Sequence, residues 1–277
     1  MTVIKSFSNF SLRVDTVKDI KILVATHKPY DFPEDTSIYM PVQVGCDEVE
    51  ERFGYTCDNT GDNISYKHRY YSDLSSLYWG WKNLDCEYIG TCHYRRYFVS
   101  KKAKNTANPI FKYILSREEL ETLLDKCPVI IAKPRKYYIE TIRSHYDHSH
   151  NPKDFDTARE VIAELAPDYL ENFDRVSNRT WAHIFNTFIM RKDIADAFCE
   201  WMYPILFELE KRVDFTGYSV YEARVCGYIS EFLLDTWLEK NNVEYQTLKL
   251  AMLEKPNWLK KGFAFLKKKF IKSERPF

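Results

Sequence analysis

The chain has 277 residues, enough for one large or two small domains, and we expect a single compact unit over residues 1–255 followed by a tail, 256–277. Lysine plus arginine and aspartate plus glutamate each number 40, so no global basic field favours a nucleic acid partner. The start of the chain lacks a signal-peptide pattern, no run reaches the ~18 apolar residues of a membrane span, and the 7 cysteines lack the spacing of a zinc cluster or a disulfide framework. We therefore expect a cytosolic protein with reduced thiols.

The first predicted strand covers residues 20–25, and a polar loop follows it directly. Thr26, His27 and Lys28 open this loop, at the kind of strand end where α/β sheets bind nucleotides. A hydroxyl and a positive charge suit a ribose or a phosphate, so we predict a donor-binding role for them. A polar turn that only caps the strand would have the same composition.

A turn at residues 61–65 separates a second predicted strand, 41–45, from a predicted helix over 66–83. Asp62, Asn63 and Ser65 stand in this turn, where they suit hydrogen bonds to a ribose or a base edge. The same residue types are also typical of an Asx turn or a helix N-cap. We assign them to donor binding with that alternative open.

The next predicted strand, 88–91, ends in a cluster of basic and aromatic side chains. His93, Arg95 and Arg96 belong to this cluster, and their burial costs desolvation energy unless an anion neutralises them. A diphosphate fits, because each guanidinium can donate two parallel hydrogen bonds to phosphate oxygens. The alternative is that both arginines pair with carboxylates at a domain seam. The order of elements predicts parallel strands joined by a helical crossover.

Two more predicted elements follow: a helix over 117–126 that opens with a capping box, and a strand over 128–132. Residues 99–108 form a predicted loop over the site, and residues 133–136 form a second basic patch. Histidines concentrate at 144–150, where we predict acceptor binding by His145 and His148. No cysteine or acidic pair of recognisable spacing supports a metal site there.

Polar residues interrupt the apolar run 181–190, which has the composition of a strand. His183 and Asn186 either form hydrogen bonds within the core or reach a ligand, and we predict that both bind the acceptor.

A predicted helix over about 221–240 carries Glu222, Arg224 and Glu231, and a turn with Asp214 precedes it. Glu231 lies two helical turns past Arg224, so both side chains are expected to point the same way. One inward arginine with one inward glutamate is either a buried ion pair or a catalytic pair.

The segment 255–277 combines seven lysines and one arginine with bulky apolar side chains at helical spacing. This composition predicts a helix that lies on an anionic membrane surface. Docking of its apolar side onto the protein body is the alternative.

Four short stretches carry a resemblance to a known family: 61–65 (GDNIS), 78–83 (YWGWKN), 93–98 (HYRRYF) and 185–190 (FNTFIM). They are similar to a bacterial family from capsule, exopolysaccharide and O-antigen gene clusters, designated domain of unknown function 4422. The resemblance covers roughly residues 20–255, and HYRRYF is its most specific part. Asp73 stands where the family pattern has glutamate, and asparagine is missing near His68.

The resemblance implies a glycosyltransferase of the GT-A type, with a Rossmann-type mixed α/β sheet flanked by helices and a helical C-terminal part. GT-A enzymes usually place an Asp-x-Asp motif after the strand that precedes His93, and its carboxylates hold Mn²⁺ or Mg²⁺ against the donor diphosphate. Here His93, Tyr94 and Arg95 stand at that point. Our hypothesis is that the protein's own cations replace the metal, although a role for Mn²⁺ or Mg²⁺ stays open.

The family also implies the reaction: transfer of galactofuranose or galactose from a UDP-sugar onto a lipid-linked oligosaccharide at the inner face of the cytoplasmic membrane. Inversion is expected, with Glu222, Glu231 or Asp214 as the base and Arg224 as its support or as a phosphate ligand. The rivals are a retaining transferase and a non-catalytic nucleotide-sugar-binding subunit of an assembly complex. A phosphotransferase or a phosphate-ester hydrolase is disfavoured, because neither a glycine-rich phosphate loop nor a metal motif is visible.

Overall fold

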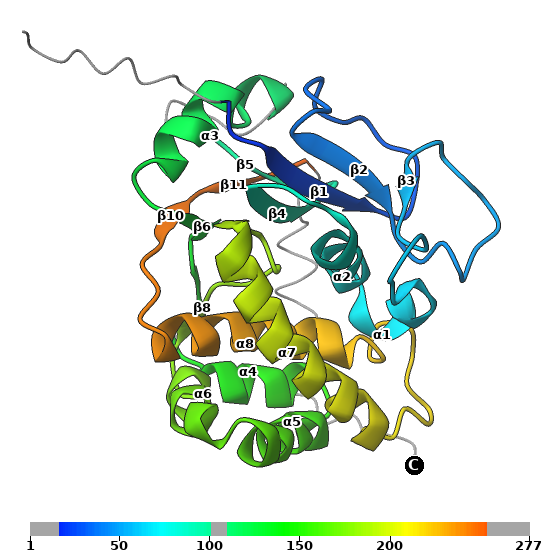
Figure 1. Cartoon of the computed structure of the whole chain (residues 1–277). Helices are drawn as coiled ribbons and strands as arrows, with labels where there is room; N and C mark the ends of the chain where they lie inside the picture. The colour runs from blue at the N-terminus through cyan, green and yellow to red at the C-terminus, as the bar shows by residue number, and fades with distance from the viewer. Residues whose placement is uncertain (1–16, 101–109, 254–277) are drawn as a thin grey trace, which may run out of the picture.

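The computed structural model describes residues 17–100 and 110–253, which build a mixed seven-stranded sheet with helices packed around it (Figure 1). The predicted tail, 256–277, and most of the predicted loop, 99–108, lie outside the described residues. The main sheet has the strand order β10-β6-β9-β4-β1-β2-β3. Its strands are β1 (Ile20–Thr26), β2 (Tyr39–Gln43), β3 (Thr56–Cys57), β4 (Tyr88–His93), β6 (Val129–Ala132), β9 (Phe188–Arg191) and β10 (Gln246–Leu248).

Two short antiparallel pairs accompany this sheet. One joins β5 (Arg96–Phe98) to β11 (Leu250–Met252), and the other joins β7 (Arg135–Lys136) to β8 (Trp181–Ala182). The helical segments are η1 (Ser65–Lys67), α1 (His68–Tyr71), α2 (Leu74–Asn83), η2 (Ile110–Tyr113), α3 (Arg117–Leu124), α4 (Ile142–Ser149), α5 (Pro152–Leu165), η3 (Pro167–Tyr169), α6 (Leu170–Ser177), α7 (Lys192–Arg212) and α8 (Val225–Lys240).

The predicted parallel crossover is confirmed, since β1 pairs in parallel with both β2 and β4. Strand β9 lies between β4 and β6 and runs antiparallel to both. Phe188, at the start of β9, pairs with Thr91 of β4 and with Ile131 of β6. The carboxyl ends of β4 and β6 and the loop before β9 therefore meet at one edge of the sheet.

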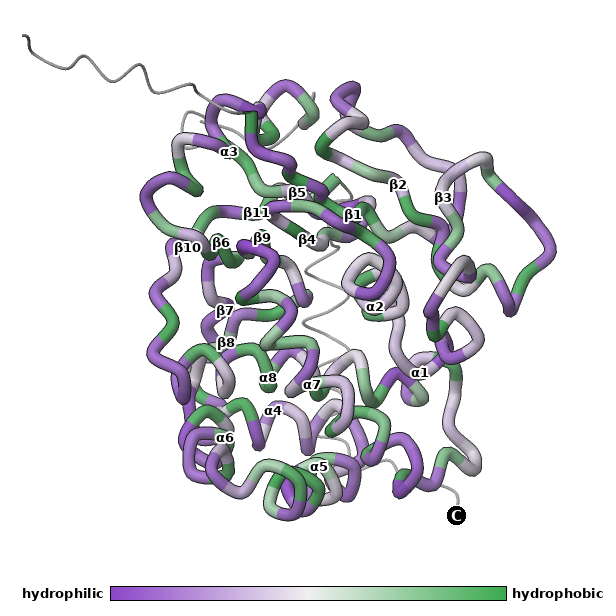
Figure 2. The backbone as a smooth tube through the Cα atoms, in the orientation of Figure 1, coloured by the Kyte–Doolittle hydropathy of each residue, from purple (hydrophilic) through white to green (hydrophobic). Residues whose placement is uncertain are grey.

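Both faces of the sheet are covered, which explains why its strands are nearly continuous apolar runs. Along β1, Leu23 packs into the core that contains α2, α7 and α8, whereas its neighbours Ile22 and Val24 pack into the core that contains α3. Helices α4, α5 and α6 lie together beyond α8, away from β1 (Figure 1). Hydrophobic and hydrophilic residues alternate along α5 and α6, as expected of helices with one buried side (Figure 2).

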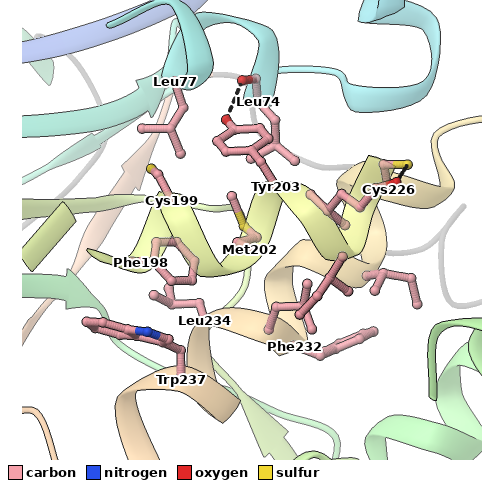
Figure 3. Close-up of a cluster of buried hydrophobic side chains, with 14 of the residues drawn as sticks. Leu74, Leu77, Phe198, Cys199, Met202, Tyr203, Cys226, Phe232, Leu234 and Trp237 are labelled. Atoms are coloured by element: carbon pink, nitrogen blue, oxygen red, sulfur yellow. Dashed lines mark hydrogen bonds between the residues drawn. The ribbon is translucent and has the colours of Figure 1, made fainter. Parts of the chain in front are cut away.

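The larger core is centred on α7 and α8 (Figure 3). Phe198 and Met202 of α7 face Leu234 and Trp237 of α8. The hydroxyl of the buried Tyr203 donates a 2.8 Å hydrogen bond to the carbonyl oxygen of Leu74, which ties α7 to the start of α2. Within residues 17–100 and 110–253, no helix has the length and apolarity that a bilayer span requires.

Three sequence-based element predictions were wrong in detail. The helix predicted over 66–83 breaks at Ser72, whose φ is +52°, so that η1, α1 and α2 are separate. The helix predicted from about 221 begins at Val225. The strand predicted over 181–190 divides into β8 and β9 around a loop in which Phe185 and Asn186 have positive φ.

Candidate functional site

A cavity of about 410 Å³ opens at the sheet edge where β4, β6 and the loop before β9 meet. Seven residues that the sequence singled out line it: His93, Arg95, Arg96, His145, Asn186, Arg224 and Glu231. Lining residues that sequence reasoning missed include Asp73, Arg135, Tyr137, Tyr146, Phe185, Tyr221 and Tyr228. The cavity wall thus carries four guanidinium groups against two carboxylates, an excess of positive charge that suits an anionic ligand.

His93 is the last residue of β4 and is buried, 6% exposed. Burial lowers the pKa of its imidazole to about 4, although the Asp73 carboxylate opposes this shift. Its Nδ1 accepts a 3.2 Å hydrogen bond from the backbone N–H of Arg95, so the proton of the neutral ring is on Nε2. His93 therefore offers the cavity a neutral hydrogen-bond donor, and the charge predicted for this cluster belongs to the arginines.

Arg96 begins β5 and packs its guanidinium against the ring of Phe185, with 4.0 Å between Cζ and the ring centroid. Burial lowers the pKa of Arg96, and the carboxylates of Asp73 and Glu231 oppose that shift through space, without a hydrogen bond to it. Arg96 is therefore oriented by an aromatic face, and the predicted alternative of direct pairing with a carboxylate is not found for it among the described residues.

Glu231, on α8, lines the cavity together with Arg96 and Arg135, whose charges act on it. Burial raises the pKa of its carboxyl to about 7, while a hydrogen bond from the backbone N–H of Phe185 and the two arginines oppose the rise. A carboxyl with a pKa near neutrality can take up or release a proton under physiological conditions. Glu231 thus has both the position and the pKa of a candidate base.

The other two predicted carboxylates do not line the cavity. The exposed Glu222 accepts hydrogen bonds from the backbone N–H (3.0 Å) and hydroxyl (2.7 Å) of Ser219. Asp214 is also exposed, and hydrogen bonds from Thr216 lower the pKa of its carboxyl. Arg224 and Glu231 both line the cavity, as the prediction that they point the same way requires, although Arg224 stands just before α8 rather than inside it.

The loop between β8 and β9 brings Asn186 to the cavity. Its side-chain NH₂ donates to the carbonyl oxygen of Gly227 (3.2 Å) and to the hydroxyl of Ser230 (2.9 Å) on α8. His183 lies elsewhere: it is 3% exposed, its backbone N–H donates to Asp235 at 2.9 Å, and its ring Nδ1 also bonds to that carboxylate. The structure therefore separates the two acceptor-side candidates of this run, with Asn186 at the cavity and His183 in the interior.

Helix α4 brings His145 to the cavity and leaves His148 outside its lining. The buried Glu140 holds both rings, with 3.0 Å between its Oε2 and Nδ1 of His145 and 2.8 Å between its Oε1 and Nδ1 of His148. Burial lowers the pKa of His145, and Glu140 opposes that shift. Across residues 17–100 and 110–253, no group of three or more His, Cys, Asp or Glu side chains is arranged to hold a metal ion.

The first donor candidates lie beside the cavity and do not line it. Thr26 donates a 2.7 Å hydrogen bond to the carbonyl oxygen of Lys28, which closes a turn at the end of β1. The ring of His27 lies 6.4 Å from that of His93 and 5.4 Å from that of Tyr94. Lys28 lies over the Tyr94 ring, 5.2 Å from its centroid. These three residues therefore flank the segment that carries His93 and Arg95.

The candidates at 61–65 do not line the cavity, and their side chains form hydrogen bonds to other residues of the protein. The Asn63 side chain accepts from the backbone N–H of Ser65 at 3.1 Å, and the Ser65 hydroxyl donates to Asp58. The Asp62 carboxylate accepts a 3.2 Å hydrogen bond from the Tyr78 hydroxyl. In the described structure these are the interactions of a turn that leads into η1, outside the cavity lining.

The missed residues come from features that a single sequence does not display. Asp73 reaches the cavity because the backbone breaks at Ser72 between α1 and α2. Arg135 reaches it because β6 ends at the same edge as β4. Its only sequence signal was the basic patch at 133–136, directly after a predicted strand.

A mixed α/β sheet flanked by helices, with a cavity rich in guanidinium groups beyond its strand ends, defines a Rossmann-type fold. Residues 21–242 match the family described as Domain of unknown function (DUF4422), and the chain belongs to that family. The fold is similar to the apo structure of WbbM, a bifunctional glycosyltransferase, with a TM-score of 0.79 and 26% identity over 86% of this chain and 46% of that one. The chain thus spans just under half the length of that protein, and no curated protein matches it.

Proposed function

We propose that the protein is a glycosyltransferase that moves a hexosyl unit, galactofuranose or galactose, from a UDP-sugar onto a lipid-linked oligosaccharide of capsule, O-antigen or exopolysaccharide synthesis. The observation that carries the proposal is the juxtaposition of Arg95 and Arg96 with Glu231, whose pKa is about 7, in one cavity. Similarity of the fold to a bifunctional glycosyltransferase supports the reaction class. The donor sugar and the acceptor come from the family resemblance.

In this proposal the cations at the end of β4 hold the donor diphosphate. Arg95 and Arg96 donate charge-assisted hydrogen bonds to its oxygens, and the Nε2–H of neutral His93 adds a third donor. This donor set does not fit a divalent cation, because the imidazole Nδ1 is already bonded to a backbone N–H and two guanidinium groups would repel the ion. We therefore propose transfer without a metal, with the arginines stabilising the UDP leaving group.

In this proposal Glu231 is the general base that removes the proton of the acceptor hydroxyl. The acceptor hydroxyl oxygen forms a bond to the anomeric carbon, the bond from that carbon to the phosphate oxygen breaks, and UDP departs with the bonding electrons. Glu231 takes the hydroxyl proton and is placed for it by the Phe185 N–H. Asn186 and His145, on the walls beside it, are the proposed acceptor contacts. Attack from the side opposite to UDP inverts the anomeric centre.

The test is UDP release by the purified chain from a panel of UDP-sugars, with and without EDTA, followed by NMR of the product anomer. We expect release with a galactosyl donor, unchanged by chelator, and an inverted product. If EDTA abolished UDP release and Mn²⁺ restored it, the metal-free proposal would be overturned. A retained anomer would assign the retaining reaction, and UDP binding without any sugar transfer would indicate a non-catalytic binding subunit.

The proposed acceptor is attached to a lipid, so we also propose that the protein works at the inner face of the cytoplasmic membrane. Membrane contact was predicted from the basic and apolar composition of the tail, 256–277, which lies outside the described residues. Its contribution is tested by vesicle binding of the chain with the tail lysines replaced by glutamine.

A further inference from the structure

We propose that residues 133–139, on the rim of the cavity, form a contact surface for an anionic lipid bilayer. The tip of this surface is Tyr138 and Ile139, and Lys133 and Lys136 precede it in the same segment. The inference deepens the proposed function, because it says which side of the cavity faces the lipid that carries the acceptor. It is independent of the tail.

The tip is unusually exposed for its composition. Tyr138 is 81% exposed and Ile139 is 82% exposed, the highest values among the large hydrophobic side chains of residues 17–100 and 110–253. Exposed apolar side chains that stand together rather than singly can mark a surface that contacts a membrane. Lys133, Arg135 and Lys136 precede them, and the segment contains no carboxylate.

The backbone holds this tip outward in a specific conformation. Tyr138 has a φ of +61°, an unfavourable region for an aromatic residue. On one side, the Tyr137 N–H donates a 2.7 Å hydrogen bond to the carbonyl oxygen of Thr180. On the other, Glu140 is 5% exposed and bonds to His145 on α4. The tip is therefore fixed at both ends, and its exposure is built into the fold.

The same segment forms part of the cavity wall. Arg135 and Tyr137 line the cavity, whereas Tyr138 and Ile139 follow immediately and do not. A bilayer in contact with the tip would thus lie next to residues of the cavity wall. A lipid-linked acceptor could then reach Glu231 without its lipid leaving the membrane.

The charge of the segment indicates that the lipid is anionic. The small apolar area of the tip favours a bilayer over a protein partner. Among the described residues, no carboxylate forms an ion pair with the exposed Lys133 or Lys136. These ammonium groups are available to lipid phosphates. Two apolar side chains cover far less than the ~1,200 Å² of a stable protein interface, but interfacial insertion needs only a few such residues.

The first test is co-sedimentation of the full chain with phosphatidylcholine vesicles, with or without phosphatidylglycerol. The double variant Tyr138→Ser with Ile139→Ser should bind the anionic vesicles about tenfold more weakly than the wild type. Tyr66→Ser is the matched control, because Tyr66 is 61% exposed and does not line the cavity, and it should bind as the wild type does. Equal binding by wild type and double variant would overturn the proposal.

A second measurement separates the tip from the tail. An environment-sensitive fluorescent amino acid at position 139 should shift to shorter wavelength with anionic vesicles and not with phosphatidylcholine alone. An unchanged spectrum on vesicles that carry the protein would overturn the proposal, as would a shift caused by self-association without lipid.

The variant Tyr138→Gly removes the side chain and accepts the positive φ, so it should bind anionic vesicles more weakly than the wild type, by less than the double variant does, while its melting temperature stays equal or rises. UDP binding should be unchanged in all these variants, because none of the substituted residues lines the cavity. Failure of UDP binding in the wild type would therefore count against the proposed function alone.

Discussion

The backbone N–H of Phe185 donates a 2.9 Å hydrogen bond to Oε1 of Glu231. Phe185 has a φ of +81°, so the loop before β9 adopts a strained conformation to aim its amide at a carboxylate on α8. The bond favours the ionised carboxylate and fixes its direction, yet burial dominates and the pKa still rises to about 7. An oriented carboxyl with a near-neutral pKa is the arrangement that proton transfer requires.

The first prediction concerns the pH dependence of transfer. Because Glu231 must be ionised to accept a proton, the rate should rise with pH through a midpoint near the pKa of about 7. Glu231→Gln should lower kcat by about 10²–10⁴-fold and leave UDP binding nearly unchanged. The measurement is UDP release between pH 5 and pH 9. Glu222→Gln, at an exposed residue outside the cavity, is the control and should retain activity; the reverse pattern would move the base to Glu222.

The same carboxyl gives stability a pH dependence of predictable sign. Its pKa is raised from 4.5 to about 7 in the folded state, so the folded protein binds the extra proton between these values. The contribution of Glu231 to the free energy of unfolding should therefore fall as pH rises through this window, by up to about 3 kcal/mol. Urea denaturation at pH 5 and pH 8 measures it. Glu231→Gln should remove that part of the slope and be the more stable protein at pH 8.

Much of the sheet could be predicted from sequence, because strands buried on both faces are short apolar runs that end in abrupt polar changes. Strand β1 and the cluster that follows β4 were predicted in this way, and the structure brings His93, Arg95 and Arg96 to the cavity. The direction of β9 was not predicted, since apolar composition does not encode whether a strand runs parallel or antiparallel to its neighbours.

The rest of the site depends on backbone features without a sequence signature. Positive φ values at Ser72 and Phe185 put Asp73 and the Phe185 N–H at the cavity, and neither position is a glycine that would have marked a turn. The histidines were predicted as a group, but which of them reaches the cavity depends on their rotation about α4. That rotation is fixed by packing and by the buried Glu140.

The third prediction addresses the diphosphate. Arg96→Ala removes a guanidinium that lies in the cavity wall, and UDP binding should weaken by about 10–100-fold through the loss of charge-assisted hydrogen bonds. Calorimetric titration with UDP measures this. Arg96 also lowers the pKa of Glu231, so the midpoint of the pH–rate profile should move to higher pH in this variant.

The control for that experiment is Arg191→Ala. Arg191 is exposed, forms an ion pair with Asp193 at 2.7 Å, and pairs with Tyr88, at the end of β4 opposite to His93. The Arg191→Ala variant should bind UDP as the wild type does. Equal loss of binding in both variants would mean that general charge, and not the β4 edge, attracts the nucleotide; no loss with Arg96→Ala would contradict its proposed role.

The fourth prediction tests the packing that positions the β4 edge. Gly90 lies in β4 against β9, and a Cβ there would lie 2.9 Å from the carbonyl oxygen of Phe188 and 2.9 Å from Cγ1 of Ile189. Since a backbone oxygen in a sheet cannot move aside cheaply, Gly90→Ala should lower the free energy of unfolding by about 1–3 kcal/mol. Gly227→Ala in α8 is the matched control, because its Cβ would have no neighbour closer than 3.4 Å and alanine favours the helix by up to about 1 kcal/mol. Chemical denaturation measures the free energy of unfolding of both variants. If Gly90→Ala were as stable as Gly227→Ala, β4 and β9 would not be packed as closely as they are in the structure.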